Sequence, residues 1–228
     1  MAAGKTNPAT GFLVTHQATT FLITNWHVLA RRDPTKGGWR GPACCARVLK
    51  VHYPTAQGRK AERYELHDVN RDHKWWTLPN GDDFADVAAL AVPPLASTIT
   101  LRSFAIPRDS CNQNVQDGVQ VDVVGFPNGE SHAGSDPVVK TGVLERTHEY
   151  HAGNCEYFWI EGAETNEGMS GSPVVMDTGN RTSLAGVYAG RGKKANQGKG
   201  LVFGTRSLQD LLGPKKTKPS CRCRFSSG

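Results

Sequence analysis

Three short segments of the chain carry side chains that could act together in catalysis. His27 follows a short apolar segment, Asp86 opens a continuously apolar one, and Ser170 lies in the turn Gly168-Met169-Ser170-Gly171-Ser172-Pro173. A serine hydroxyl becomes a good nucleophile when a base removes its proton, and histidine has a suitable pKa near neutrality. A carboxylate beside a histidine fixes its tautomer and stabilises the imidazolium that forms. These residue types therefore indicate nucleophilic attack on a carbonyl.

The turn around Ser170 has the composition that such an attack requires. The tetrahedral intermediate carries an oxyanion, which needs hydrogen-bond donors already in position. A Gly-x-Ser turn can aim the backbone N–H groups of Gly168 and Ser170 at one point. Glycine at positions 168 and 171 also permits a positive φ and close approach of a substrate.

Other candidate groups fit catalysis or metal binding less well. Asp82 and Asp83 rival Asp86, but no buried strand follows them, so we interpret them as solvated loop charges. His148 and His151, with Cys155 nearby, resemble metal ligands, yet a zinc protease helix places its second histidine four residues after the first. The pair Cys221 and Cys223 has no partner pair. We therefore expect no metal and no cofactor.

The elements that must position these residues are short strands. Apolar or alternating segments recur between turn signals, and the chain contains 25 Gly and 13 Pro. One helix is predicted over 208–212, capped by Ser207 and ended by Gly213-Pro214. This pattern predicts an all-β fold of two antiparallel barrels. The predicted parts are an N-terminal barrel over 8–105 that carries His27 and Asp86, a C-terminal barrel over 112–213 that carries Ser170 and ends in the helix, and a basic, disordered tail over 214–228.

The net charge of +6 is unevenly distributed. From Arg191 to the end there are ten basic residues against one acid, Asp210, a net of +9, so the preceding residues carry −3. This distribution argues against a nucleic-acid binder that uses its whole surface. Binding through the basic end stays open as an alternative, although Phe225 is the only aromatic side chain of the tail that could stack on bases.

The lack of a targeting pattern and the arrangement of the cysteines both favour the cytoplasm. The start of the sequence has no signal-peptide pattern, and no stretch approaches the roughly 20 apolar residues of a membrane span. The six cysteines do not form a disulfide-like pattern, because Cys44 and Cys45 are adjacent and two others lie in the tail. We expect a cytoplasmic protein with reduced thiols and no membrane partner.

The segments Thr-Asn-x-His-Val, Asp-Val-Ala-x-Leu and Gly-x-Ser-Gly-Ser-Pro, in this order, resemble those of trypsin-like, chymotrypsin-fold serine endopeptidases. The resemblance is greatest to compact bacterial or viral members and covers roughly residues 10–212. It implies two six-stranded antiparallel β-barrels with a short C-terminal helix. It also implies that His27 is the general base, that Asp86 orients it and that Ser170 is the nucleophile. Gly168 and Ser170 would form the oxyanion hole.

The same resemblance bears on specificity. The base of the primary pocket in trypsin-like enzymes lies six residues before the nucleophile, which is Glu164 here. A carboxylate at that position would favour Arg or Lys in the substrate. A glutamate on the rim or surface is the alternative interpretation. Ala189 and Gly190 are expected along the substrate backbone, and Tyr188 is expected either in a pocket wall or in the core.

Activation is expected to differ from that of the digestive members, which pair a liberated N-terminal amine with an aspartate just before the nucleophile. Met169 occupies that position. We therefore expect activity without N-terminal cleavage, and regulation by a partner protein stays open. The expected partner is a protein or peptide substrate. The alternative from another class is a pseudoprotease or peptide-binding module.

Overall fold

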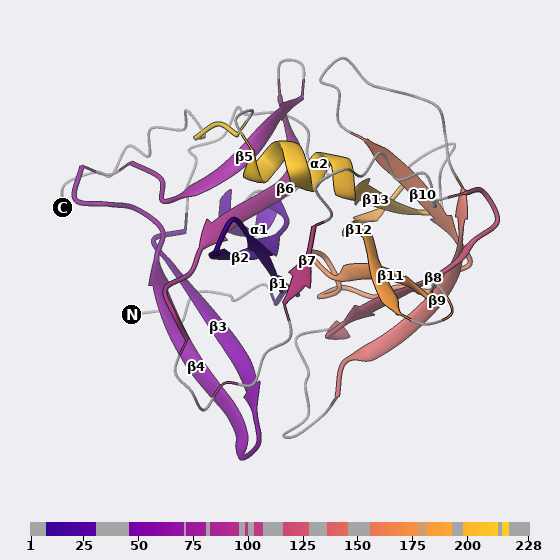
Figure 1. Cartoon of the computed structure of the whole chain (residues 1–228), viewed down its shortest axis with the longest axis horizontal. Helices are drawn as coiled ribbons and strands as arrows, with labels where there is room; N and C mark the ends of the chain where they lie inside the picture. Colours follow the sequence, from indigo (N-terminus) through magenta and orange to yellow (C-terminus); the bar gives the residue numbers. More distant parts are fainter. Residues whose placement is uncertain are drawn as a thin grey trace.

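In a computed structural model of the chain, the described residues are 8–30, 46–70, 72–80, 83–95, 99, 103–106, 116–127, 136–145, 156–177, 179, 181–192, 198–213 and 216–218. They form two β-rich halves that lie side by side, with one helix across the top (Figure 1). The candidate residues His27 and Asp86 belong to the first half, and Ser170 belongs to the second.

The first half is a sheet with a separate hairpin. The sheet has five strands in the order β5-β6-β2-β1-β7, and β7 runs parallel to β1. The hairpin pairs β3 with β4. The elements are β1 (Phe12–His16), β2 (Thr19–Thr24), α1 (Trp26–Ala30), β3 (Val48–Thr55), β4 (Gly58–Glu65), β5 (Trp75–Asn80), β6 (Asp83–Ala91) and β7 (Phe104–Ala105).

The second half is a closed barrel of six strands in the order β10-β13-β12-β11-β8-β9. Apolar side chains fill its interior, among them Phe158, Met169 and Val202, each at most 1% exposed. A last helix follows β13 directly. The elements are β8 (Gln120–Gly125), β9 (Val138–Glu145), β10 (Tyr157–Glu161), β11 (Pro173–Asp177), β12 (Thr182–Arg191), β13 (Gly200–Gly204) and α2 (Thr205–Leu212).

The predicted chymotrypsin-like, all-β fold class with a short C-terminal helix is confirmed. The first half differs in detail, because its described strands form an open sheet and a hairpin instead of one closed six-stranded barrel. The burial patterns explain the difference. Most residues of β4 are exposed and β3 alternates only weakly, so the hairpin has little apolar surface to bury and projects from the body (Figure 1).

The C-terminal helix also starts earlier than predicted. Gly204, and not Ser207, occupies the N-cap position of α2. Ser207 lies inside the helix, where its buried hydroxyl donates a hydrogen bond to the carbonyl of Glu156 at 2.9 Å. A polar residue before an apolar run suggested a cap, but tertiary packing gives this hydroxyl its partner.

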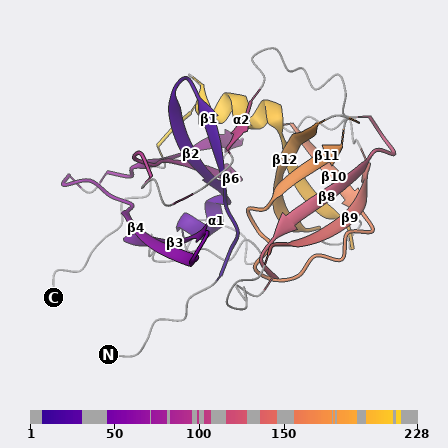
Figure 2. The same cartoon turned by 60° about the horizontal axis from the view of Figure 1, so that its bottom comes forward.

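A single apolar cluster joins the two halves. It contains Phe12 and Val87 from the first half, Val187 from the second, and Leu208 and Leu211 from α2. Figure 2 shows α2 lying over both halves. The predicted division between residues 105 and 112 falls largely on residues outside the described ones, so it stays a prediction. The shared cluster indicates that the halves pack as one unit.

Part of the predicted tail is attached to the first half. Thr217 and Thr77 exchange backbone hydrogen bonds of 3.0 and 3.1 Å, and the ammonium of Lys216 lies 4.8 Å from the ring centroid of Trp76. Residues 214–228 are therefore not disordered throughout, while 219–228 lie outside the described residues, as do all six cysteines. In the described part of the chain, neither helix has the length and apolarity of a membrane span.

The packing of α2 yields a stability prediction. Leu208 is fully buried in the shared cluster, so Leu208→Ala should lower the free energy of unfolding by about 2–5 kcal/mol. Arg206→Ala, at an exposed position of the same helix, should change it by less than about 0.5 kcal/mol. Urea denaturation measures both values. Equal effects of the two substitutions would contradict the role given to α2.

Candidate active site

His27 and Asp86 are in direct contact. The Nδ1 atom of His27 lies 2.8 Å from Oδ2 and 3.0 Å from Oδ1 of Asp86. The backbone N–H of His27 also donates a hydrogen bond to Oδ1, at 2.9 Å. The carboxylate thus holds the imidazole with the proton on Nδ1, which leaves Nε2 as the basic nitrogen. The side chains are 17% and 20% exposed, so a reacting group can approach them.

Local structure explains why the two residues meet. Strand β2 pairs with β6 as far as Thr24 and Ala88, and the chain then turns into α1. The buried side chain of Asn25 donates a hydrogen bond to the backbone carbonyl of Asp86 at 2.6 Å. The first turn of α1 therefore sits against the start of the buried part of β6, with His27 facing the carboxylate.

The turn that carries Ser170 is built on two glycines with positive φ. Gly168 has φ +93° and Gly171 has φ +87°, which are conformations that L-residues rarely adopt. A Cβ at Gly171 would lie 2.1 Å from the carbonyl oxygen of Thr10 and 2.6 Å from Oγ1 of Thr24. Between the glycines, the side chain of Met169 is fully buried in the second barrel. Its burial fixes the turn and leaves Ser170 half-exposed.

The backbone N–H groups of this turn differ in whether they have a hydrogen-bond acceptor. The N–H of Met169 bonds to the carbonyl of Asn166, and that of Gly171 bonds to the carbonyl of Tyr188. The N–H groups of Gly168 and Ser170 donate to no group in the described part of the chain. Two unused donors beside the serine hydroxyl can serve a developing oxyanion.

Thr10, which the sequence analysis did not single out, connects the serine turn to the first half. Its N–H donates to the carbonyl of Ser170 at 2.9 Å, and its hydroxyl donates to the carbonyl of Gly168, also at 2.9 Å. Thr24 donates its hydroxyl to the carbonyl of Thr10 at 2.9 Å. Because Thr24 ends the strand that leads into His27, this chain of bonds links the serine turn to the histidine segment. Among the described residues, no hydrogen bond joins His27 to Ser170 directly.

The predicted substrate-lining residues differ in exposure. Tyr188 and Ala189 are buried, Gly190 is half-buried with φ +135°, and Glu164 is exposed. Thr165, beside Glu164, is 2% exposed and its hydroxyl is hydrogen-bonded to the hydroxyl of Tyr188 at 2.5 Å. Burial raises the pKa of Tyr188, whereas the Thr165 hydroxyl and the positive charge of Arg191 act in the opposite direction.

Thr165 and Arg191 are further residues that the sequence analysis missed. The guanidinium of Arg191 donates a hydrogen bond to the backbone carbonyl of Thr165. Two signals were available in the sequence. Thr165 lies five residues before the nucleophile, and Arg191 lies just after the expected substrate strand. The sequence pattern gave no reason to pair them, because the contact joins segments 26 residues apart.

The remaining candidates fall where the structure gives no description of their side chains. Asp82, His148, His151 and Cys155 lie outside the described residues, and the side chain of Asp83 is not among those described. In the described ranges, no three His, Cys, Asp or Glu side chains gather in a way that could hold a metal ion.

The chain is similar to a known protein family and to two solved structures. A family model described as a trypsin-like peptidase domain matches residues 9–184. The MamO protease domain from Magnetospirillum magneticum is 16% identical, with a TM-score of 0.54 over 93% of this chain and 92% of that one. The active form of the Rv3671c protease from M. tuberculosis is 18% identical, with a TM-score of 0.50 over 94% of this chain and 78% of that one. No curated protein matches the sequence.

The two solved structures support a shared fold, whereas the family model matches the amino-acid sequence. At identities of 16% and 18%, the two solved structures are similar to this chain in architecture only. The matched residues 9–184 include the histidine, aspartate and serine segments.

The serine turn provides a matched test of close packing. Gly171 and Gly179 share a φ of +87°, but a Cβ at Gly179 meets nothing within 4 Å. Gly179→Ala should therefore cost only the conformational penalty, about 1–2 kcal/mol of unfolding free energy. Gly171→Ala should cost clearly more, about 3 kcal/mol or above, because Thr10 must move. Chemical denaturation compares them, and equal losses would contradict the contact between Gly171 and Thr10.

Proposed function

This chain belongs to the trypsin-like peptidase family, and on that premise we propose that it is a serine endopeptidase that hydrolyses protein substrates through an acyl-enzyme. One observation carries the proposal, namely the contact of 2.8 Å between His27 Nδ1 and Asp86 Oδ2. This contact supports a base whose free nitrogen can accept a proton from Ser170. The unused N–H groups beside Ser170 support the same reaction.

In the first half of the proposed reaction, Ser170 attacks the scissile carbonyl. Its Oγ forms a bond to the carbonyl carbon while its proton moves to Nε2 of His27. Asp86 stabilises the resulting imidazolium through Nδ1. The oxyanion accepts hydrogen bonds from the N–H groups of Gly168 and Ser170.

Collapse of the intermediate then releases the first product. The C–N bond breaks, and His27 returns its proton to the leaving amine. A water molecule attacks the acyl-enzyme with His27 again as the base. Breakdown of this second intermediate frees the carboxylate product and restores Ser170.

Activity without N-terminal cleavage is part of the proposal. Met169 occupies the position of the ion-pairing aspartate in digestive relatives, and its side chain is fully buried among apolar residues. An apolar thioether gives a liberated amine no partner there. The chain beginning at Met1 is therefore proposed to be competent as made, and control by a partner protein is the proposed alternative to control by cleavage.

A preference for Arg or Lys before the scissile bond stays a prediction. It requires the carboxylate of Glu164 to face the substrate. Glu164 is exposed and forms no hydrogen bond or ion pair with another described residue. A cleavage profile of the wild type measures this preference.

The second candidate is a peptide-binding module without catalysis. The absence of a hydrogen bond between His27 and Ser170 among the described residues is the observation that favours it. However, such bonds are often long in ligand-free enzymes and tighten only with substrate bound. The intact pair of His27 and Asp86 favours catalysis, because a binding module has no need of a polarised imidazole.

Removal of the nucleophile separates the two candidates. Ser170→Ala should lower kcat for peptide hydrolysis by at least about 10⁴-fold, because no covalent intermediate can form. Ser172→Ala, two residues away and also in the turn, should retain activity. A proteomic cleavage profile of the full chain makes the comparison. Identical profiles for wild type and Ser170→Ala would exclude the serine mechanism.

A separate substitution tests the role of the Asp86 carboxylate. Asp86→Asn should keep the geometry but lose the charge and disturb the tautomer of His27, so kcat should fall by about 10³–10⁴-fold. Asp122→Asn is the matched control, because Asp122 accepts a hydrogen bond from Thr141 on the exposed side of the second barrel. Peptide hydrolysis at pH 7–8 measures both. A fall below tenfold for Asp86→Asn would contradict its proposed role.

A further inference from the structure

Arg191 forms hydrogen bonds with residues of the segments next to the serine turn. Arg191, the last residue of β12, donates a hydrogen bond to the carbonyl of Thr165. The hydroxyl of Thr165 is hydrogen-bonded to that of Tyr188, which also interacts with the Arg191 side chain. Thr165 and Tyr188 are each 2% exposed, whereas Arg191 is exposed. Two buried polar groups thus hold one accessible guanidinium.

The position of this cluster relative to the nucleophile follows from the backbone. Strand β12 runs beside the serine turn, since Gly171 donates to the carbonyl of Tyr188 and Tyr188 donates to the carbonyl of Ser172, both at 2.9 Å. On the other side, Thr165 precedes Ser170 by five residues in one loop. The cluster therefore joins the two segments in which substrate-binding residues are expected from the sequence, at 164 and at 188–190.

A glycine in β13 leaves room for the ring of Tyr188. A Cβ at Gly200 would lie 2.7 Å from Cε2 of Tyr188, so the glycine permits the ring to lie where it does. Gly200 pairs with Arg191 across the strands. The tyrosine hydroxyl is thereby held toward Thr165 and Arg191.

The charges around the cluster are unbalanced. Within the described part of the chain, no carboxylate forms an ion pair with Arg191. The carboxylate of Glu145 is engaged by Lys199, on which Glu161 also acts. A guanidinium has five N–H donors, and the hydrogen bonds to Thr165 and Tyr188 use only part of them. The cluster therefore offers a positive charge with unused donors.

We propose that Arg191 binds the carboxylate of an acidic substrate residue, Glu or Asp, immediately before the scissile bond. This inference rests on the proposed function, because it concerns the substrate residue whose carbonyl Ser170 attacks. Guanidinium and carboxylate form paired, charge-assisted hydrogen bonds. An Arg or Lys at this substrate position would place a second cation beside Arg191, so the cluster disfavours the specificity predicted from Glu164.

Matched peptides test the inference. Substrates that differ only in Glu, Gln or Arg before the scissile bond are compared by kcat/KM with the full chain. We expect Glu to exceed Gln by about tenfold or more, and Arg to be the poorest. Arg191→Gln should bring the Glu-to-Gln ratio close to one, while Arg191→Lys should keep part of it. Tyr188→Phe, which removes the bracing hydroxyl, should lower the ratio less than Arg191→Gln.

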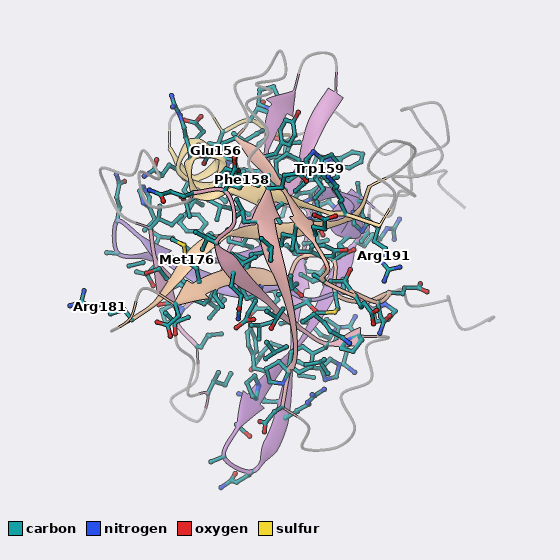
Figure 3. All side chains as sticks on the ribbon, turned by 90° about the vertical axis from the view of Figure 1, so that its right-hand side faces the viewer. Glu156, Phe158, Trp159, Met176, Arg181 and Arg191 are labelled. Carbon is teal, nitrogen blue, oxygen red and sulfur yellow. The ribbon has the colours of Figure 1, made fainter. Side chains whose placement is uncertain are left out.

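A second arginine of the same barrel is the control. Arg181, just before β12, is exposed and lies at the opposite side of the barrel from Arg191 (Figure 3). Arg181→Gln should leave the ratio unchanged, which separates a local contact from a change of net charge. A preference for Gln or Arg in the wild type, or an unchanged ratio in Arg191→Gln, would overturn the inference.

A binding measurement keeps the two proposals distinguishable. Amide-capped peptides with Glu, Gln or Arg at the same position are titrated against Ser170→Ala, in which no cleavage interferes. Preferred binding of the Glu peptide that disappears in the Ser170→Ala, Arg191→Gln double variant supports the inference even if the wild type hydrolyses nothing. Equal binding of all three peptides overturns it, even if hydrolysis that depends on Ser170 is robust.

Discussion

The arrangement of the site depends on the hydrogen bonds of one threonine. Thr10 binds the carbonyls of Gly168 and Ser170 with its hydroxyl and N–H, its own carbonyl accepts from Thr24, and its hydroxyl accepts from the N–H of Phe126. It therefore ties the serine turn to both halves of the molecule. Thr10 is 4% exposed, so each bond it loses would leave a buried polar group unpaired, at a cost of about 1–3 kcal/mol.

In the proposed reaction, the two halves contribute different parts of the chemistry. The first half would supply the base, because the carboxylate of Asp86 meets both the ring and the backbone of His27. The second half would supply the nucleophile and two backbone donors, on a turn that contains the buried Met169. The apolar cluster shared with α2 keeps the halves packed together. The hydrogen bonds of Thr10 therefore need to fix only the geometry of the serine turn.

Much of this could be predicted from the sequence, but not all. The segments around His27, Asp86 and Ser170 are local patterns, and the sequence therefore predicts the fold class and the candidate triad. The network of Thr165, Tyr188 and Arg191 joins segments far apart in the chain, and the role of Thr10 depends on its three-dimensional neighbours. The open first half and the cap of α2 differ from the prediction, because tertiary packing decides which strands close a barrel and where the hydroxyl of Ser207 finds its partner.

The most direct test of the account is the rate at which a fluorophosphonate labels Ser170. Labelling requires both an activated serine and correct placement against His27. Wild type should be labelled at Ser170 alone, as read by peptide mass spectrometry, and Thr10→Val should react about 10–100-fold more slowly while remaining folded. Thr15→Val, which removes the β1 hydroxyl that is bonded to Ser103, should react at the wild-type rate. Equal rates for all three proteins, or labelling away from Ser170, would contradict the account.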